Sequence, residues 1–332
     1  MLGSSDRPLC DTYDLAMLDL DGVVYVGGDA VPGAPDHLAA AREAGLRLAF
    51  ITNNAARPPQ RVAEHLRELG IEAEDSDVVT SAQAAARLLV DRFGQGAHVA
   101  LLGGAGLEDA LVAEGLKPVS VHDEAQAVVS GYGPDVVWRD IMQAAVRIRD
   151  GLPWVASNTD LTFPTEYGVA PGHGVLVRTL SSFSGVEPVV AGKPQRPLLD
   201  ETVRRVGGDR PLMVGDRLDT DIAGAVNAGL DSLLVMTGVT GLAELVAATP
   251  EERPTYVAAD LAGLLEAHTA PGSDGEDPAL GGWTASVEDG RLVVTGAGDV
   301  SDWWRVVAAT AWRHLDDSGE SVRVDDVRAP LP

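Results

Sequence analysis

Short apolar runs alternate with amphipathic stretches along the chain, and this order restricts the possible folds more than any other feature of the sequence. The first run, "LAMLDL" (residues 15–20), is followed by the amphipathic "APDHLAAAREAG" (34–45). The next run, "LRLAFITNN" (46–54), is followed by "PQRVAEHLRELG" (59–70). A repeated strand–helix order predicts a parallel, doubly wound sheet with helices on both faces, which is an α/β fold.

A second α/β block interrupts this pattern. Its expected strands and helices are, in order, "HVALLGG" (98–104), "LEDALVAEG" (107–115), "AQAVVSG" (125–131), "VVWRDIMQAAVRIRDG" (136–151) and "LPWVASN" (152–158). The segment "VEPVVAGKP" (186–194) then resumes the first pattern, with a further helix and strand after it. We therefore expect a core in two parts, residues 1–83 and 187–268, with a cap domain inserted at 84–186.

The C-terminal part of the chain has a different pattern. Residues 269–282, "TAPGSDGEDPALGG", have the Pro, Gly and acidic composition of a linker. After it we expect a hairpin over 283–296 that turns at Asp289-Gly290, a helix over 299–317 and a strand at "SVRVDDV", 321–327. These elements predict a small α+β domain over 283–332, in which the tryptophans form the core.

The charge of the chain restricts its partners. The 332 residues carry 25 Lys and Arg against 50 Asp and Glu, a net charge of −25. Such a field repels nucleic acids and anionic membranes, so we expect neither as a partner. An anionic substrate would need local positive charge at its site. The single cysteine, Cys10, excludes an internal disulfide, and the N-terminus has no secretory pattern, so we expect a cytoplasmic protein.

Acidic residues gather where two expected strands end. Asp19 and Asp21 end the first apolar run, and their side chains share one side if the backbone stays extended. Two such carboxylates can act as nucleophile and general acid/base, or they can hold a hard cation. The stretch "MVGDRLDTD" adds Asp216 and Asp221, with Asp219 between them as an expected surface acid. Oxygen ligands without His or Cys favour Mg²⁺ over zinc.

Two further strand ends carry groups that suit a phosphoryl group. Thr52 and Asn53 offer a hydroxyl, an amide and backbone N–H groups, and Lys193 in "AGKP" offers a positive charge. Each segment alone is also compatible with an ordinary cap or turn, because Asp and Asn often fill such places. Together the four segments follow four strands of one expected sheet, where the carboxyl ends of the strands form the ligand crevice.

The segments "DLDGVVYVG", "TNN", "AGKP" and "VGDRLDTDI", in this order, resemble the four motifs of the haloacid dehalogenase superfamily of phosphohydrolases. The inserted block, with "NTDLTFPTEYGVAPGHGVLV" near its end, resembles the large α/β cap of the NagD-like branch. The resemblance covers about residues 13–268. It implies a doubly wound, Rossmann-like parallel sheet with an inserted α/β cap, to which the small C-terminal domain is added.

The resemblance also implies a role for each motif residue. Asp19 would attack phosphorus and form an aspartyl-phosphate, and Asp21 would serve as the general acid and base. Mg²⁺ would bind the Asp19 carboxylate, the Asp21 carbonyl and the Asp216 carboxylate, with Asp221 in its outer sphere. The residues expected to hold substrate or phosphate are Thr52, Asn53, Asn54, Lys193, Asn158 and Asp160.

The expected function is therefore Mg²⁺-dependent hydrolysis of a small phosphorylated metabolite, with glycerol 3-phosphate as the favoured substrate. Phosphoglycolate, pyridoxal phosphate, a sugar or nucleotide monophosphate, and phosphoryl transfer to a sugar are the alternatives. A non-enzymatic scaffold is disfavoured because the four motifs are intact. A homodimer through the cap or the C-terminal domain is left open.

Several other residues have plainer interpretations. Gly22 is expected to let the chain turn after Asp19, and "GGAGLEDAL" (103–111) to be a strand–turn–helix joint rather than a dinucleotide site. His173 is expected to be a loop histidine, and Cys10 is not expected to be catalytic. Arg57 departs from the small hydroxyl residues usual after "TNN" in the family.

Overall fold

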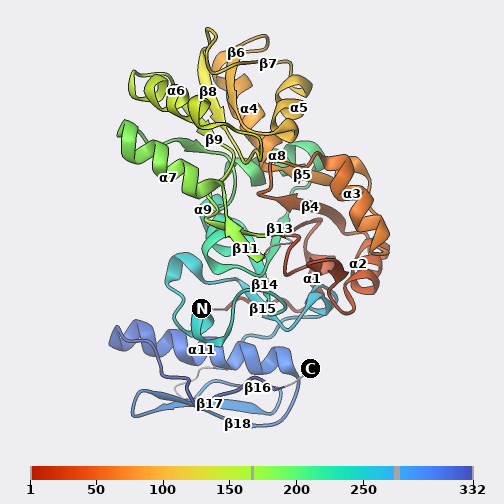
Figure 1. The fold of residues 1–332 in the computed structure, drawn as a ribbon. Helices are drawn as coiled ribbons and strands as arrows, with labels where there is room; N and C mark the ends of the chain where they lie inside the picture. Colours follow the sequence, from red (N-terminus) through yellow and green to blue (C-terminus); the bar gives the residue numbers. More distant parts are fainter. Residues whose placement is uncertain (1, 166–167, 273–276, 331–332) are drawn as a thin grey trace. The chain divides into compact units, whose positions relative to one another are not determined.

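The computed structural model describes residues 2–165, 168–272 and 277–330 (Figure 1). The chain forms two compact units. The first contains the residues up to 49, residues 69–71 and the residues from 207 onward; the second contains residues 50–68 and 72–206. No helix among the described residues has both the length and the apolar character needed to cross a lipid bilayer.

A six-stranded sheet has the strand order β15-β14-β13-β1-β4-β5. Its strands are β1 (Leu15–Leu18), β4 (Arg47–Thr52), β5 (Val78–Thr80), β13 (Pro211–Gly215), β14 (Asp231–Val235) and β15 (Tyr256–Ala258). The pairs β1–β13, β13–β14, β14–β15 and β4–β5 are parallel, which confirms the predicted doubly wound sheet. The strands β4 and β5 lie on one side of β1, and the later strands β14 and β15 lie on the opposite side, beyond β13. In such sheets, ligands bind where the strand order reverses.

The first unit surrounds its part of this sheet with short helices and a small hairpin. These elements are α1 (Leu9–Thr12), β2 (Tyr25–Val26), β3 (Asp29–Ala30), α2 (Ala34–Glu43), α9 (Ala223–Ala228) and α10 (Leu242–Val246). The four residues of β1 are completely buried, as a strand covered on both faces requires.

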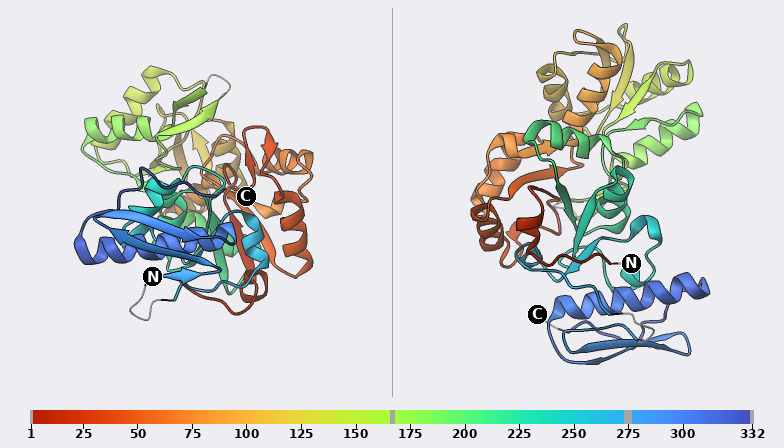
Figure 2. Two further views of the ribbon diagram at one scale, coloured as in Figure 1. Left: turned by 90° about the horizontal axis from the view of Figure 1, so that it is seen from below. Right: turned by 180° about the vertical axis from the view of Figure 1, so that it is seen from behind.

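The second unit contains a five-stranded sheet in the order β12-β9-β8-β6-β7, in which every pair is parallel. Its elements are α3 (Pro59–Glu68), α4 (Ser81–Phe93), β6 (His98–Leu102), α5 (Ala105–Ala113), β7 (Lys117–Val119), β8 (Ala127–Ser130), α6 (Trp138–Arg149), β9 (Trp154–Ala156), β10 (Thr162–Thr165), β11 (Gly168–Pro171), α7 (His173–Ser184), β12 (Val189–Val190) and α8 (Pro197–Val206). Helices α6 and α7 lie side by side on one face of this sheet, and α4 and α5 lie on the other (Figures 1 and 2).

Three expectations for this part of the chain can be compared with the structure. The joint after β6 is confirmed, because β6 ends at Leu102 and α5 begins at Ala105. The inserted sheet extends past residue 186, because Val189 and Val190 pair with β9 instead of returning to the six-stranded sheet. His173 is not a loop residue: it is the first residue of α7, it is buried, and its Nε2 lies 3.2 Å from the Ser130 hydroxyl.

The C-terminal part forms a three-stranded antiparallel sheet covered by one long helix, α11 (Val300–Ser318). The strands are β16 (Ala279–Leu280), β17 (Trp283–Glu288) and β18 (Arg291–Gly296). The predicted turn is confirmed, since Asp289 and Gly290 have φ of 49° and 73°, as the hairpin turn of an Asp-Gly pair requires. The predicted strand over 321–327 is wrong. Only an isolated bridge between Arg323 and Arg291 forms there.

Helix α11 packs on both sides, against the small sheet and against the rest of the first unit (Figures 1 and 2). Trp303, Trp304 and Trp312 belong to one buried cluster with Leu234 of β14 and Val257 of β15. The indole of Trp312 also donates a hydrogen bond to the Leu245 carbonyl at 2.8 Å. The tryptophans of this helix are therefore core residues, as predicted, but the core is shared with the six-stranded sheet.

Replacing Trp312 with Ala tests this shared core. The indole is 2% exposed, so its loss leaves a large cavity and should lower the free energy of unfolding of the first unit by about 3–5 kcal/mol. Urea unfolding followed by circular dichroism measures the change. Trp138→Ala is the matched control, because that indole is 65% exposed and its loss should change stability by no more than about 0.5 kcal/mol. Equal stability of the two variants would contradict a shared core.

The buried His173 should make stability depend on pH. Burial lowers its pKa from 6.5 to about 4, so the unfolded chain binds more protons than the folded chain between these values. The free energy of unfolding should rise as the pH rises through this window. Deprotonation of His173 should account for up to about 3 kcal/mol of that rise. His268 has a pKa lowered to about 4 by burial as well and acts in the same direction. Unfolding curves of wild type and His173→Gln between pH 4 and 7 should differ in slope; parallel curves would contradict the assignment.

Candidate active site

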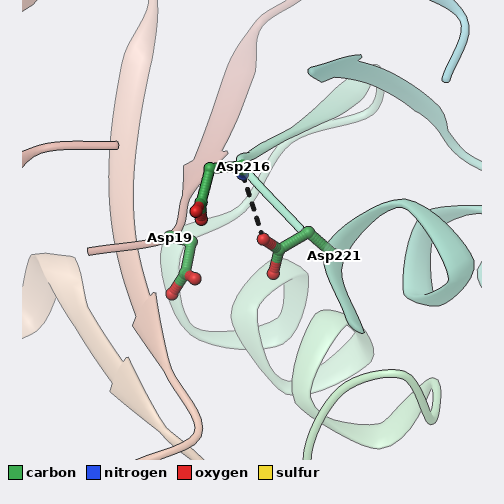
Figure 3. Close-up of side chains that lie close together, drawn as sticks. All are labelled: Asp19, Asp216 and Asp221. Carbon is green, nitrogen blue, oxygen red and sulfur yellow. Dashed lines mark hydrogen bonds between the residues drawn. The ribbon is translucent and has the colours of Figure 1, made fainter. Parts of the chain in front are cut away.

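Three carboxylates meet at the edge of the six-stranded sheet in the first unit. Asp19 follows β1, Asp216 follows β13, and Asp221 lies on a π-helical turn, Leu218–Ile222 (Figure 3). One ligand oxygen from each lies within 4.8 Å of the others. The strands explain the meeting: β1 and β13 are parallel neighbours in which Leu18 pairs with Val214, so both chains leave the sheet at one edge.

Backbone N–H groups hold the two buried members of this cluster. The Asp221 Oδ2 accepts hydrogen bonds from the N–H groups of Asp216 at 3.2 Å and Arg217 at 3.1 Å. The π-helical turn makes this possible because the Ile222 N–H bonds back to the Arg217 carbonyl, five residues earlier. The Asp216 Oδ2 accepts from the Val239 N–H at 2.6 Å. Backbone donors therefore fix the positions of these two carboxylates.

The cluster has the composition of a hard-cation site. Asp216 and Asp221 are completely buried, and close buried carboxylates repel each other unless positive charge compensates them. All three donors are oxygen, which suits Mg²⁺. Two glycines make room for Asp216: an added Cβ would lie 2.4 Å from its Oδ2 at Gly22 and 2.0 Å at Gly238. The residues present thus fit the predicted divalent cation.

Asp21 lies apart from the cluster that Asp19 joins. The two side chains were expected to share one side if the backbone stayed extended, but the strand ends before them, and Asp21 is exposed. Strand β1 ends at Leu18, and the chain then turns at Gly22, whose φ is +89°. The Gly22 N–H bonds to the Tyr25 carbonyl at 2.8 Å, which confirms the predicted turn.

In the second unit, three of the predicted site residues lie around a fourth, Asn53. Its carboxamide contacts the main chain of Lys193 and the carboxylate of Asp160, and its carbonyl accepts a hydrogen bond from Asn158 at 2.7 Å. Lys193 is 2% exposed, so its charge lies inside the protein. The Asn158 carboxamide also accepts from the Asp160 N–H at 3.2 Å, which ties the two residues into one turn.

The other predicted phosphate-binding residues make local contacts. The Thr52 hydroxyl oxygen accepts a hydrogen bond from the Asn54 N–H at 3.1 Å. The Asn54 side chain, on an exposed residue, accepts from the Ala56 N–H at 2.8 Å. Both contacts are typical of a loop that follows a strand. Contact of these residues with substrate stays a prediction.

Asp219 and Cys10 agree with the plainer interpretations that the sequence gives them. Asp219 is exposed and paired with Arg217 at 2.8 Å, as expected of a surface acid. Cys10 is buried, and burial raises the pKa of its thiol, which disfavours the reactive thiolate.

Sequence reasoning missed the part that the turn after β14 plays in the acidic cluster. There the Thr237 hydroxyl donates to the Gly22 carbonyl at 2.6 Å, Gly238 makes room for Asp216, and the Val239 N–H holds it. A glycine directly after an apolar strand, in "LLVMTGVTG", was the available signal. Ser81, whose hydroxyl donates to the Asn53 carbonyl at 2.6 Å, was also missed.

Known proteins resemble this chain over most of its length. The D-glycerol 3-phosphate phosphatase of Mycobacterium tuberculosis is 42% identical over 300 residues, which cover 89% of this chain and 82% of that protein. The acid sugar phosphatase of Staphylococcus aureus is 35% identical over 252 residues, covering 75% of this chain and 95% of the relative.

Solved structures resemble its fold. The glycerol phosphate phosphatase from Mycobacterium tuberculosis in complex with magnesium has a TM-score of 0.83 and 41% identity and covers 92% of each chain. The 4-nitrophenylphosphatase from Thermotoga maritima has a TM-score of 0.72 and 30% identity, covering 77% of this chain and 98% of the other.

The family comparison agrees with both. Residues 16–117 match the sequence model of the haloacid dehalogenase-like hydrolases, and residues 190–264 match a second model of HAD-like hydrolases. The predicted resemblance and the predicted enzyme class are confirmed by these matches. The chain belongs to the haloacid dehalogenase-like hydrolase family.

Proposed function

We propose that this protein is a Mg²⁺-dependent phosphatase whose preferred substrate is glycerol 3-phosphate. The observation that carries the proposal is the meeting of Asp19, Asp216 and Asp221 in a chain that is 42% identical to a D-glycerol 3-phosphate phosphatase. The magnesium in the structure of a glycerol phosphate phosphatase supports the choice of cation. Asp19 and Asp216 would bind it, together with the Asp21 carbonyl, and Asp221 would lie in its outer sphere.

Asp19 is the proposed nucleophile. Its backbone N–H donates to the Val214 carbonyl at 2.9 Å, so the start of the loop is fixed to the neighbouring strand. A carboxylate oxygen of Asp19 forms a bond to phosphorus as the bond from phosphorus to the substrate oxygen breaks. A bound cation would neutralise negative charge that otherwise keeps the phosphoryl group away from Asp19.

Asp21 is the proposed general acid and base. As the first step proceeds, its carboxyl gives a proton to the departing alcohol oxygen. Water then attacks the phosphorus of the aspartyl-phosphate, and Asp21 takes the proton of this water. Phosphate leaves, and the Asp19 carboxylate is restored. The exposure of Asp21 suits this role because a proton carrier has to reach both the alcohol and the water.

The proposed phosphate-binding residues follow other strands of the chain. Lys193 carries the positive charge that a chain with a net charge of −25 needs in order to hold an anion. Thr52 and the backbone of Asn53 are proposed to bind phosphoryl oxygens, while Asn54, Asn158 and Asp160 are proposed substrate contacts. Their strand-end positions and the family resemblance support these roles.

Other substrates remain alternatives within the same chemistry. A sugar phosphate has specific support, because the acid sugar phosphatase of Staphylococcus aureus is 35% identical and covers 75% of this chain. Phosphoglycolate, pyridoxal phosphate, a nucleotide monophosphate and transfer to a sugar acceptor remain the further alternatives.

The domain boundaries and the oligomeric state are also proposals. We retain a two-part core with an inserted cap and a C-terminal domain, with the cap sheet extended to β12. A homodimer through the cap finds support in two exposed apolar side chains, Met142 of α6 and Phe183 of α7. Cytoplasmic location rests on the single, buried Cys10.

The test of the function is phosphate release from a panel of phosphorylated metabolites, with Mg²⁺ and with a chelator. We expect kcat/KM to be highest for glycerol 3-phosphate and activity to vanish with the chelator. Asp19→Asn should lower kcat by at least about 1,000-fold while circular dichroism stays unchanged, because an amide is a poor nucleophile. A higher kcat/KM for sugar phosphates would favour the acid sugar phosphatase alternative. Near-normal activity of Asp19→Asn would exclude the mechanism.

The cation site has its own test. Asp221→Asn keeps an oxygen for the Asp216 and Arg217 N–H groups but removes a charge, so the affinity for Mg²⁺ should fall about 10–100-fold. Calorimetric titration of the substrate-free protein with Mg²⁺ measures this without turnover. Asp219→Asn is the control, since this acid pairs with Arg217 outside the cluster. Equal affinities of the two variants would argue against a cation at the cluster.

A further inference from the structure

The carboxamide of Asn53 holds the main chain of Lys193 at two points. Its Oδ1 accepts a hydrogen bond from the Lys193 N–H at 2.8 Å, and its Nδ2 donates to the Lys193 carbonyl at 3.0 Å. The two residues are 140 positions apart in the chain, so this contact joins the loop after β4 to the segment after β12. A single side chain thus fixes both polar groups of the lysine backbone.

The second hydrogen of the same amide is also used. Asn53 Nδ2 donates to the Asp160 Oδ1 at 3.0 Å. A carboxamide has one oxygen and two N–H donors, and here all three are engaged. The reversed orientation would place the oxygen against the Lys193 carbonyl and the Asp160 carboxylate, so the contacts themselves assign the amide. Neither Asp nor Ser could reproduce this set of bonds.

The backbone carbonyl of Asn53 also accepts two hydrogen bonds. It accepts from the Ser81 hydroxyl at 2.6 Å and from the Asn158 carboxamide at 2.7 Å. With the three carboxamide bonds, Asn53 makes five hydrogen bonds to four residues, all within the second unit. Asn53 is 8% exposed and Lys193 is 2% exposed, so little water competes for these bonds.

Gly192 provides independent support for the contact between Asn53 and the main chain of Lys193. A Cβ added there would lie 2.5 Å from the Asn53 Oδ1 and 2.8 Å from the Ser157 carbonyl oxygen. Only a residue without a side chain lets the main chain before Lys193 lie this close to the carboxamide. The glycine and the asparagine therefore fit each other as a pair.

We propose that the side chain of Asn53 is a positioning residue for the reaction: it holds Lys193 and Asp160 in fixed places while its own carboxamide stays out of contact with substrate. The inference rests on the proposed function, in which Lys193 neutralises the phosphoryl group. It changes the expectation for Asn53, whose backbone N–H remains the proposed phosphate contact.

A mutant cycle between Asn53 and Asp160 tests the proposal. Asn53→Asp removes two donors and sets a carboxylate against Asp160, so kcat should fall about 30-fold or more, with KM changed less than about threefold. In the Asp160→Asn background, the carboxylate introduced at position 53 can accept a hydrogen bond from the amide introduced at position 160. The effect of Asn53→Asp should then be at least about fivefold smaller. Comparing the effect in the two backgrounds cancels any contribution of Asp160 itself.

Two further variants sharpen the test. Gly192→Ala should also lower kcat, because the added methyl group would displace the Asn53 carboxamide. Asn227→Asp is the matched control: it makes the same chemical change on an exposed residue of the first unit and should leave kcat unchanged. All kinetic values are compared at equal folded fractions from urea unfolding, so that lost stability is not counted as lost activity.

A readout without turnover separates this inference from the proposed function. Hydrogen exchange of the Lys193 amide, followed by NMR, should become at least about tenfold faster in Asn53→Ala and stay unchanged in Asn227→Asp. If no phosphorylated compound is hydrolysed but exchange responds in this way, the proposed function fails and the holding contact stands. If kcat of Asn53→Asp stays within threefold of wild type, or its loss is the same in both backgrounds, the positioning role is overturned.

Discussion

The parallel pairing of β1 with β13 is the contact on which the candidate site depends. Because Leu18 pairs with Val214, two chain segments leave the sheet side by side and bring Asp19 close to Asp216. Carboxylates in such a place repel each other, so the fold has to hold them against that repulsion. Backbone N–H donors and glycines do so here, and a hard cation would compensate the remaining charge. The acidic cluster is thus costly for the folded chain and suited to a metal.

Residues that take no part in the proposed reaction position the residues that do. Gly22 and Gly238 leave room for Asp216, and the π-helical turn brings Asp221 back to the end of β13. In the second unit Gly192 does the same for Asn53. Each of these glycines lies close to a side chain from another segment of the chain. Sequence spacing shows the acids and the lysine, but it does not show which glycine faces which side chain.

Local signals were sufficient to predict much of the fold. Apolar periodicity predicted most strands of both parallel sheets, although it missed β5, β7 and β15. The Asp289-Gly290 pair predicted the hairpin turn, because such features depend on neighbouring residues. The errors share a different cause. The sheet that β12 joins, the missing strand over 321–327 and the burial of His173 all depend on long-range packing. The exposure of Asp21 belongs with them, since it follows from where β1 ends.

The C-terminal helix shows how packing far from the site can bear on it. A small domain buries a small fraction of its surface, and α11 adds to the buried surface by packing against β15 as well as against the three-stranded sheet. Arg305 of this helix donates to the Val257 carbonyl of β15 at 2.9 Å, and β15 pairs with β14. The chain leaving β14 forms the turn whose Val239 N–H holds Asp216. The C-terminal core and the acidic cluster therefore share β14, and two paired strands connect α11 to the turn that holds Asp216.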